Sequence, residues 1–176
     1  SSVRAVRALM RVGLTLEGLD TRGCSPLECA VDDGDSALAR VRALIEAGAD
    51  VNAGNARGSP LFLCAVLLLP WKRSPEVLRL LVASGADPHA IDSHGSNAFH
   101  WALNEMERSP EDSVRETLGY LKELGVDIER RNNDDQTPLA KALHRGSAIE
   151  ICVLCELDAD PNAVCTRVEC FGDTCN

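Results

Sequence analysis

Cysteine is the residue type in this sequence with the clearest potential for chemistry. Eight cysteines occur in 176 residues, and five of them gather near the end, at positions 152, 155, 165, 170 and 175. Closely spaced thiolates can bind Zn²⁺ tetrahedrally. Cys152 and Cys155, however, fall on a helical pattern in which Cys155 replaces a core leucine, and the later spacings match no common zinc module. A structural zinc ion is therefore only an alternative, and we expect no cofactor.

The four histidines do not form a catalytic motif. They are scattered over separate units, with His89 in one, His94 and His100 in the next, and His144 in the last full unit. No glycine-rich phosphate loop, nucleophile elbow or zinc-binding helix pattern is present. The sequence therefore predicts a protein that is not an enzyme.

Charge and hydrophobicity narrow the classes of partner. The formal net charge is -9, whereas nucleic acids and anionic membrane surfaces require concentrated positive charge. No apolar run approaches about 18 residues, the length of a membrane-spanning helix, and the start lacks the apolar stretch of a secretory signal. We expect an intracellular, cytoplasmic protein with reduced thiols that binds neither nucleic acid nor membranes.

A short motif ending in aspartate recurs along the chain, and everything else is spaced around its copies. Asp50, Asp87, Asp127 and Asp160 follow one another at intervals of 37, 40 and 33 residues, and Thr15 marks a fainter first copy. Apolar residues at helical spacing precede each copy. A period in the thirties indicates a solenoid of two-helix units.

The same motif contains a signal that ends a helix. Gly48, Gly85 and Gly125 can adopt the left-handed backbone conformation that a side chain with a Cβ disfavours. Asp158 takes this position in the last unit. The four equivalent helices are therefore expected to end at these residues.

A second recurring piece predicts where the first helix of each unit begins. A Ser, Thr or Asn can cap a helix, and Pro fits the first helical position. Small alanines follow, where helices can approach closely. The four pieces are Ser25-Pro26-Leu27, Ser59-Pro60-Leu61, Asn97-Ala98-Phe99 and Thr137-Pro138-Leu139.

These two motifs together resemble the ankyrin repeat. The segments 20–27 and 92–100 match the opening Asp-x-x-Gly-x-Thr-Pro-Leu-His well, whereas Gly54 to Ser59 is one residue short and Asp135 replaces a glycine. The resemblance implies an all-α repeat solenoid of stacked helix-turn-helix units joined by short hairpin-like turns. It also implies a structural role for His100 and a function in protein binding.

The repeats define one domain over residues 1–176. We expect a partial unit at 1–17, full units at about 20–53, 54–90, 92–130 and 132–163, and the start of a further unit at 164–176. Uncapped solenoid ends would expose apolar faces. The chain is therefore interpreted as part of a larger multidomain protein, or otherwise as a monomer with a degenerate cap.

The two middle units are lengthened between their helices. Both extensions end in Arg-Ser-Pro-Glu, at 73–76 and 108–111, where Ser and Pro suit the start of a helix. In the first extension, residues 67–69 can simply lengthen the preceding helix. Trp71 either packs against the fold or acts as a hot spot for a partner.

We expect a partner protein to bind a concave groove, formed by the turn tips and the first helices, together with the extended inter-helix loops. The resemblance places the candidate residues by position. They are Arg22, Asp32, Asp33, Arg57, Leu67, Trp71, His94, Asn104, Glu105, Asp134, Gln136, His144 and Arg145.

Overall fold

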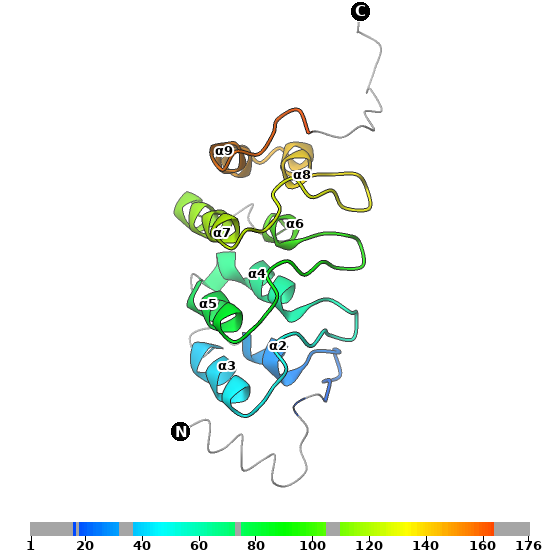
Figure 1. Cartoon of the computed structure of the whole chain (residues 1–176), viewed down its shortest axis with the longest axis vertical. Helices are drawn as coiled ribbons and strands as arrows, with labels where there is room; N and C mark the ends of the chain where they lie inside the picture. Colours follow the sequence, from blue (N-terminus) through cyan, green and yellow to red (C-terminus); the bar gives the residue numbers. More distant parts are fainter. Residues whose placement is uncertain (1–15, 17, 32–36, 73–74, 105–109, 164–176) are drawn as a thin grey trace, which may run out of the picture.

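The described helices stand in two parallel columns, as the computed structural model shows (Figure 1). It describes residues 16, 18–31, 37–72, 75–104 and 110–163, and only the backbone at 68–72 and 75. One column contains α2 (Pro26–Val31), α4 (Leu61–Lys72), α6 (Ala98–Ala102) and α8 (Pro138–Arg145). The other contains α3 (Ala37–Glu46), α5 (Pro75–Ala83), α7 (Glu111–Glu123) and α9 (Ala148–Glu156). This architecture confirms the predicted all-α repeat solenoid.

The core lies between the two columns and is built mainly from Leu, Val and Ala. In the first column, an alanine is buried at the same place in every helix, at Ala30, Ala65, Ala102 and Ala142. Because alanine is small, it lets successive helices pack closely, and α2, α4, α6 and α8 contact one another in that order. The core therefore continues from layer to layer, as a solenoid requires.

Turns project beyond the first column (Figure 1), and those at 20–24, 55–59, 92–96 and 132–136 share one pattern of hydrogen bonds. In the third turn, Asp92 Oδ1 accepts hydrogen bonds from the backbone N–H groups of His94 and Ser96, both at 2.8 Å. Asp20, Asn55 and Asn132 accept the equivalent pair of bonds in the other turns. Hydrogen bonds from one Asp or Asn side chain to the backbone stabilise a turn, and they do not require particular side chains at the other positions of the turn. We call the residues 20–24, 55–59, 92–96 and 132–136 the tips.

The second tip corrects the predicted alignment of the second full unit. Asn55 replaces the aspartate, so this tip has its full length and is not one residue short. The helix α4 therefore begins at Leu61, and the Pro60 carbonyl accepts the first helical bond from Cys64 N at 3.3 Å. The prediction that Ser59 caps this helix and Pro60 opens it was wrong by one position.

The predicted left-handed helix ends are confirmed. Gly48, Gly85 and Gly125 have φ values of 98°, 95° and 73°, and Asp158 adopts the same conformation with φ 64°. The only other described non-glycine residue with positive φ is Asp135, at φ 59°, where the other tips have glycine. Two aspartates therefore occupy a conformation that favours glycine.

The buried residues of α9 differ in part from the predicted pattern. Its buried face consists of Glu150, Val153 and Leu154, and Cys155 is exposed. The equivalent residue in α7, five positions before the turn aspartate, is the exposed Lys122. This position lies at the edge of the buried stripe, so Cys155 does not replace a core leucine as predicted.

The described part of the first extension is helical, as expected for residues 67–69. α4 runs for 12 residues to Lys72, so the segment 67–72 continues the first helix. Residues 73–74 and 105–109 of the extensions, and almost all of the partial units predicted at 1–17 and 164–176, lie outside the described residues. Among the helices that the structure describes, none is long and apolar enough to cross a membrane.

Candidate functional site

The four tips present one exposed side chain each at the same position of the turn. These residues are Arg22, Arg57, His94 and Asp134, two residues after the Asp or Asn that holds the turn. Their backbone N–H groups donate to Oδ1 of that Asp or Asn at 2.8 to 3.0 Å. The turn does not depend on their side chains, so the residue type can differ from one tip to the next. The fold thus displays a row of variable side chains along one edge of the stack.

A second row lies deeper, on the first helices. Cys29, Cys64, Trp101 and Lys141 each follow the Asp or Asn of their tip by nine residues. Their sizes differ greatly, from two small thiols to an indole ring. We call the tips together with α2, α4, α6 and α8 the tip face.

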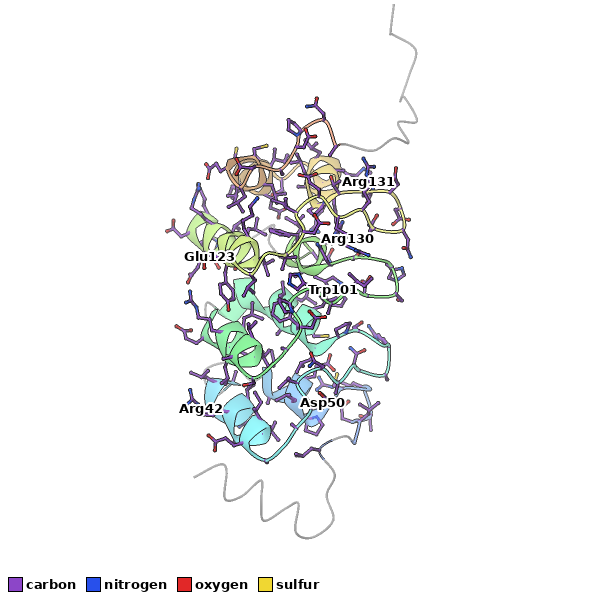
Figure 2. The ribbon with its side chains drawn as sticks, in the orientation of Figure 1. Arg42, Asp50, Trp101, Glu123, Arg130 and Arg131 are labelled. Atoms are coloured by element: carbon purple, nitrogen blue, oxygen red, sulfur yellow. The ribbon has the colours of Figure 1, made fainter. Side chains whose placement is uncertain are left out.

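A cavity of about 260 Å³ opens on the tip face, where the first two small residues of this row lie. It is bounded by α2 and its tip, by α4 and its tip, and by Trp101 of α6. Its walls include three thiols together with Leu67 and Trp101, and Cys behaves as a small hydrophobic residue. Figure 2 shows Trp101 in the first column beside α4, on the side of the tips, whereas Arg42 and Glu123 lie on the side away from the tips.

Hydrogen bonds hold the cavity walls in place. Trp101 Nε1 donates to Asp92 Oδ2 at 2.9 Å, which fixes the indole ring. Asn55 Nδ2 donates to Glu28 Oε1 at 3.1 Å and contacts Cys64 Sγ at 3.7 Å. The cavity is therefore shaped by residues whose positions the fold determines.

Two arginines stand at the cavity, and their surroundings differ. Arg22 Nε pairs with Asp20 Oδ2 at 3.1 Å. The pKa of Asp20 is lowered to about 2, chiefly by the backbone hydrogen bond from Cys24 and also by Arg22. The Arg57 guanidinium makes no hydrogen bond or ion pair with any residue in the described part of the chain. Arg57 is therefore available to an external anion.

The cavity thiols are poor nucleophiles. Burial raises the pKa of Cys24, Cys29 and Cys64, and that of Cys64 reaches about 12. Because the thiolate is the reactive form, these side chains act as walls and not as catalytic groups.

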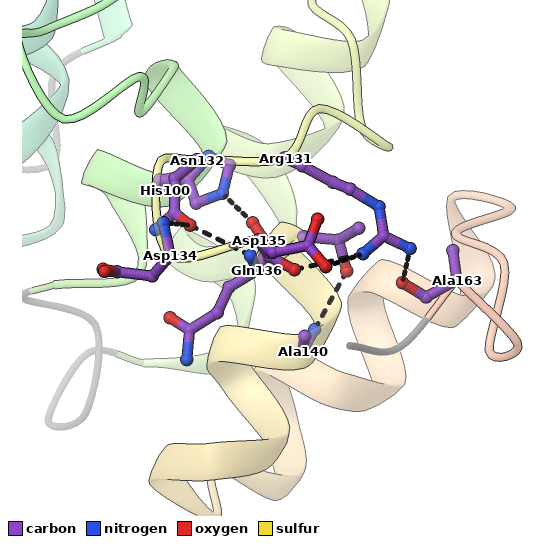
Figure 3. A network of polar contacts seen from close by, with 9 residues as sticks. His100, Arg131, Asn132, Asp134, Asp135, Gln136, Ala140 and Ala163 are labelled. Atoms are coloured by element: carbon purple, nitrogen blue, oxygen red, sulfur yellow. Dashed lines mark hydrogen bonds and ion pairs between the residues drawn. The ribbon is translucent and has the colours of Figure 1, made fainter. Parts of the chain in front are cut away.

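His100 has the structural role that the resemblance implied. It is fully buried, and its Nε2 donates to the carbonyl of Gln136 in the next tip at 2.9 Å (Figure 3). Burial lowers the pKa of His100. In the same network Arg131 donates to the carbonyls of Asp135 and Ala163, both at 3.1 Å. The bonds from His100 to Gln136 and from Arg131 to Ala163 connect successive units.

Several other candidate residues make contacts within the fold. Arg145 is half-buried and donates to the carbonyls of Leu103 at 2.7 Å and Asn104 at 3.1 Å. Gln136 is half-buried at the end of its tip, and Asn104 and His144 are exposed. Asp32, Asp33 and Glu105 lie outside the described residues, and so does the side chain of Trp71.

The cysteine-rich segment receives no structural support as a metal site. Cys152 and Cys155 are exposed on α9. Within the part of the chain that the structure describes, no three His, Cys, Asp or Glu residues are placed to hold a metal ion. The three later cysteines lie outside that part.

Sequence reasoning did not identify Cys29, Cys64 and Trp101 as residues of the candidate site. The signal was available, because these three residues share the position nine after the Asp or Asn of a tip. The one-residue error in the second unit hid this register.

Comparisons with known proteins agree with the repeat architecture. A family model described as ankyrin repeat matches residues 22–56. The chain is 35% identical to the B-cell lymphoma 3 protein homolog of Mus musculus over 150 residues, which are 83% of this chain and 32% of that protein. It is 36% identical to the B-cell lymphoma 3 protein of Homo sapiens over 149 residues, 82% of this chain and 31% of that protein.

The chain also resembles a third protein, at lower identity. The chain is 30% identical to the nuclear factor NF-kappa-B p105 subunit of Gallus gallus over 162 residues, 89% of this chain and 15% of that protein. The chain spans about a third or less of the length of these curated relatives.

Proposed function

Since this chain belongs to the ankyrin-repeat family, whose repeats are protein-interaction modules, we propose that it binds a partner protein through the tip face. The candidate contacts on this surface are the exposed tip residues Arg22, Arg57, His94 and Asp134, with Leu67 in the cavity beside them. Contacts from 32–33, Trp71 and Glu105 remain part of the proposal, and none of them is needed for it.

One observation carries the proposal. Turns held by the same backbone hydrogen bonds display exposed side chains of three types in register, two Arg, one His and one Asp, while the residue that holds each turn is Asp or Asn in all four. A position that the fold fixes in space but does not use for its own packing suits recognition of another surface. The tips and the first helices together offer such positions over the length of the stack.

The proposal does not include catalysis or a bound metal. The names of the relatives given above are not names of enzymes. Among the described residues, the cavity thiol of Cys64 is poorly ionised, and His100 is buried in a structural role. An intracellular, cytoplasmic location stays a prediction from the sequence.

Site-directed photocrosslinking tests which surface meets a partner. A photoreactive amino acid is introduced at exposed tip positions 57 and 134, and at exposed positions 42 and 123 on the second helices. Each variant is expressed in cells, irradiated and examined for covalent adducts. We expect a discrete adduct of one size from both tip positions and not from positions 42 and 123.

Positions 42 and 123 serve as controls for the two tip positions. Arg42 and Glu123 are also exposed but lie on the side away from the tips (Figure 2). Adducts that form from positions 42 and 123 and not from the tips would contradict the proposal.

A further inference from the structure

We propose that the cavity beside Leu67 receives a bulky apolar side chain of the partner, and that a carboxylate next to this side chain in the partner pairs with Arg57. This inference rests on the proposed function, because it assigns the partner's chemistry at one place on the tip face. It defines the partner segment as an apolar residue adjacent to Asp or Glu.

The cavity exists because two equivalent residues are small. Trp101 and Lys141 occupy the ninth position after the Asp or Asn of their tips, and both are long side chains that cover their part of the surface. Cys29 and Cys64 occupy the same position in the two earlier units. A small side chain at this place leaves the space between α2 and α4 open.

The size and the walls of the cavity indicate an apolar side chain. Its volume of about 260 Å³ lies below the range of roughly 300–1,000 Å³ in which small-molecule and cofactor pockets fall. Leu67, the Trp101 ring and the thiols form much of the wall, and they gain from contact with another apolar group. Interface hot spots are commonly anchors of this kind that fill a pocket.

The charge at the cavity indicates what stands beside the anchor. The charged residues in its lining are Arg22, Glu28 and Arg57. Asp20 already pairs with Arg22, and Glu28 accepts a hydrogen bond from Asn55. Arg57 remains, and it is exposed next to the apolar walls in a chain whose net charge is -9. A carboxylate satisfies this guanidinium, whereas a partner's Lys or Arg would be repelled by it.

Selection from a random peptide library tests this chemistry without a known partner. The full 176-residue chain is immobilised, and peptides displayed on phage are selected and sequenced. We expect enrichment of Leu, Ile, Met, Phe or Trp directly next to Asp or Glu. Synthetic copies of the enriched peptides are then titrated against the chain and its variants.

Substitutions in the cavity give matched pairs. Cys29→Trp places at this position the side chain that Trp101 already shows in α6, and it should weaken peptide binding roughly tenfold or more. Arg42→Trp introduces the same side chain at an exposed position away from the tips, and it should change affinity less than about twofold. Arg57→Glu should weaken binding by about tenfold, and Arg42→Glu, which reverses an exposed charge away from the tips, should leave it unchanged.

The outcomes separate this inference from the proposed function. Circular dichroism and urea unfolding establish that each variant is folded, and Arg57→Glu changes only an exposed side chain. Enriched peptides that are basic, peptides that bind Cys29→Trp as well as wild type, or a selection that enriches nothing would each overturn the inference. The photocrosslinking result at positions 57 and 134 would stand in all three cases.

Discussion

At the residue scale, Asp158 stands where the other described units have glycine, and this difference should reduce the stability of the fold. It ends α9 with φ 64°, in the place that Gly48, Gly85 and Gly125 take in the other units. A residue with a Cβ is strained in this conformation, and its negative charge lies at the unfavourable end of a helix.

We predict that Asp158→Gly stabilises the protein. Relief of backbone strain and removal of the charge should together raise the free energy of unfolding by about 0.5–1 kcal/mol, measured by urea denaturation. Asp158→Asn isolates the contribution of the charge. Gly85→Asp is the reciprocal change. A Cβ at Gly85 would meet nothing within 4 Å, so a loss of stability in this variant would come from backbone strain and the added charge and not from a steric clash. A neutral or destabilising Asp158→Gly would refute this account.

The buried His100 makes stability depend on pH. Burial keeps the pKa of His100 below its usual value, so the folded chain holds the ring neutral at pH values where the unfolded chain binds a proton. The contribution of this residue is thus fully present above about pH 6.5 and falls as the pH drops below that value.

We therefore expect the urea concentration at the unfolding midpoint of the wild type to be lower at pH 5.5 than at pH 7.5. His100→Gln should be less stable at pH 7.5 but should show a smaller change between the two pH values. His144→Gln, which alters an exposed histidine, serves as the control. An identical pH dependence in wild type and His100→Gln would show that this ring is not the source.

The described cysteines should differ in their reactivity. Cys64 is buried and its pKa is about 12, whereas Cys152 and Cys155 are exposed on α9. At pH 7.5 a thiol-alkylating reagent should modify Cys64 at least about 100-fold more slowly than either of the other two. Peptide mapping by mass spectrometry measures each site separately. Comparable rates for Cys64 and Cys152 would mean that the cavity wall opens readily.

At the element scale, α6 shows why short helices need their neighbours. It has five residues, and an isolated helix of this length is unstable in water. Asn97 and His100 form a capping box at its start. After its end, Arg145 of α8 donates to the Leu103 and Asn104 carbonyls, while Lys141 donates to the His100 carbonyl at 3.0 Å. Residues of the next unit therefore complete this helix.

We predict that Arg145→Met lowers the free energy of unfolding by about 1–2 kcal/mol. Methionine retains an apolar stem but loses both hydrogen bonds and the positive charge near the end of a helix. His144→Gln, next to it and exposed, should change stability by less than about 0.5 kcal/mol. Urea denaturation of both variants measures the difference. Equal stabilities would show that α6 does not depend on this contact.

At the scale of the whole molecule, sequence reasoning worked where the repeat period carried the information. The helix ends at Gly48 and Asp158 and the buried alanines follow from positions that recur, whereas the role of His100 was implied by the resemblance to the ankyrin repeat. These features depend on local backbone geometry, which each repeat encodes independently.

The errors and omissions have a different physical origin. Asn55 replaces Asp in the second tip by offering the same oxygen acceptor, so a pattern based on residue names missed the turn. Cys155 lies at the edge of a helix that is apolar on most sides, where periodicity does not fix the buried face. The cavity arises from side chains of three units, and only their arrangement in space shows that they enclose it.

The central claim is that a partner protein binds the tip face. Its most direct test is the dissociation constant for the protein captured by crosslinking from position 57, measured by titration calorimetry. The variant Arg22→Glu, Arg57→Glu, Asp134→Lys should bind at least about tenfold more weakly than wild type, while Arg42→Glu, Glu123→Lys should bind within about twofold of it. Unchanged affinity in the tip variant, or a loss confined to the variant on the second helices, would contradict the claim.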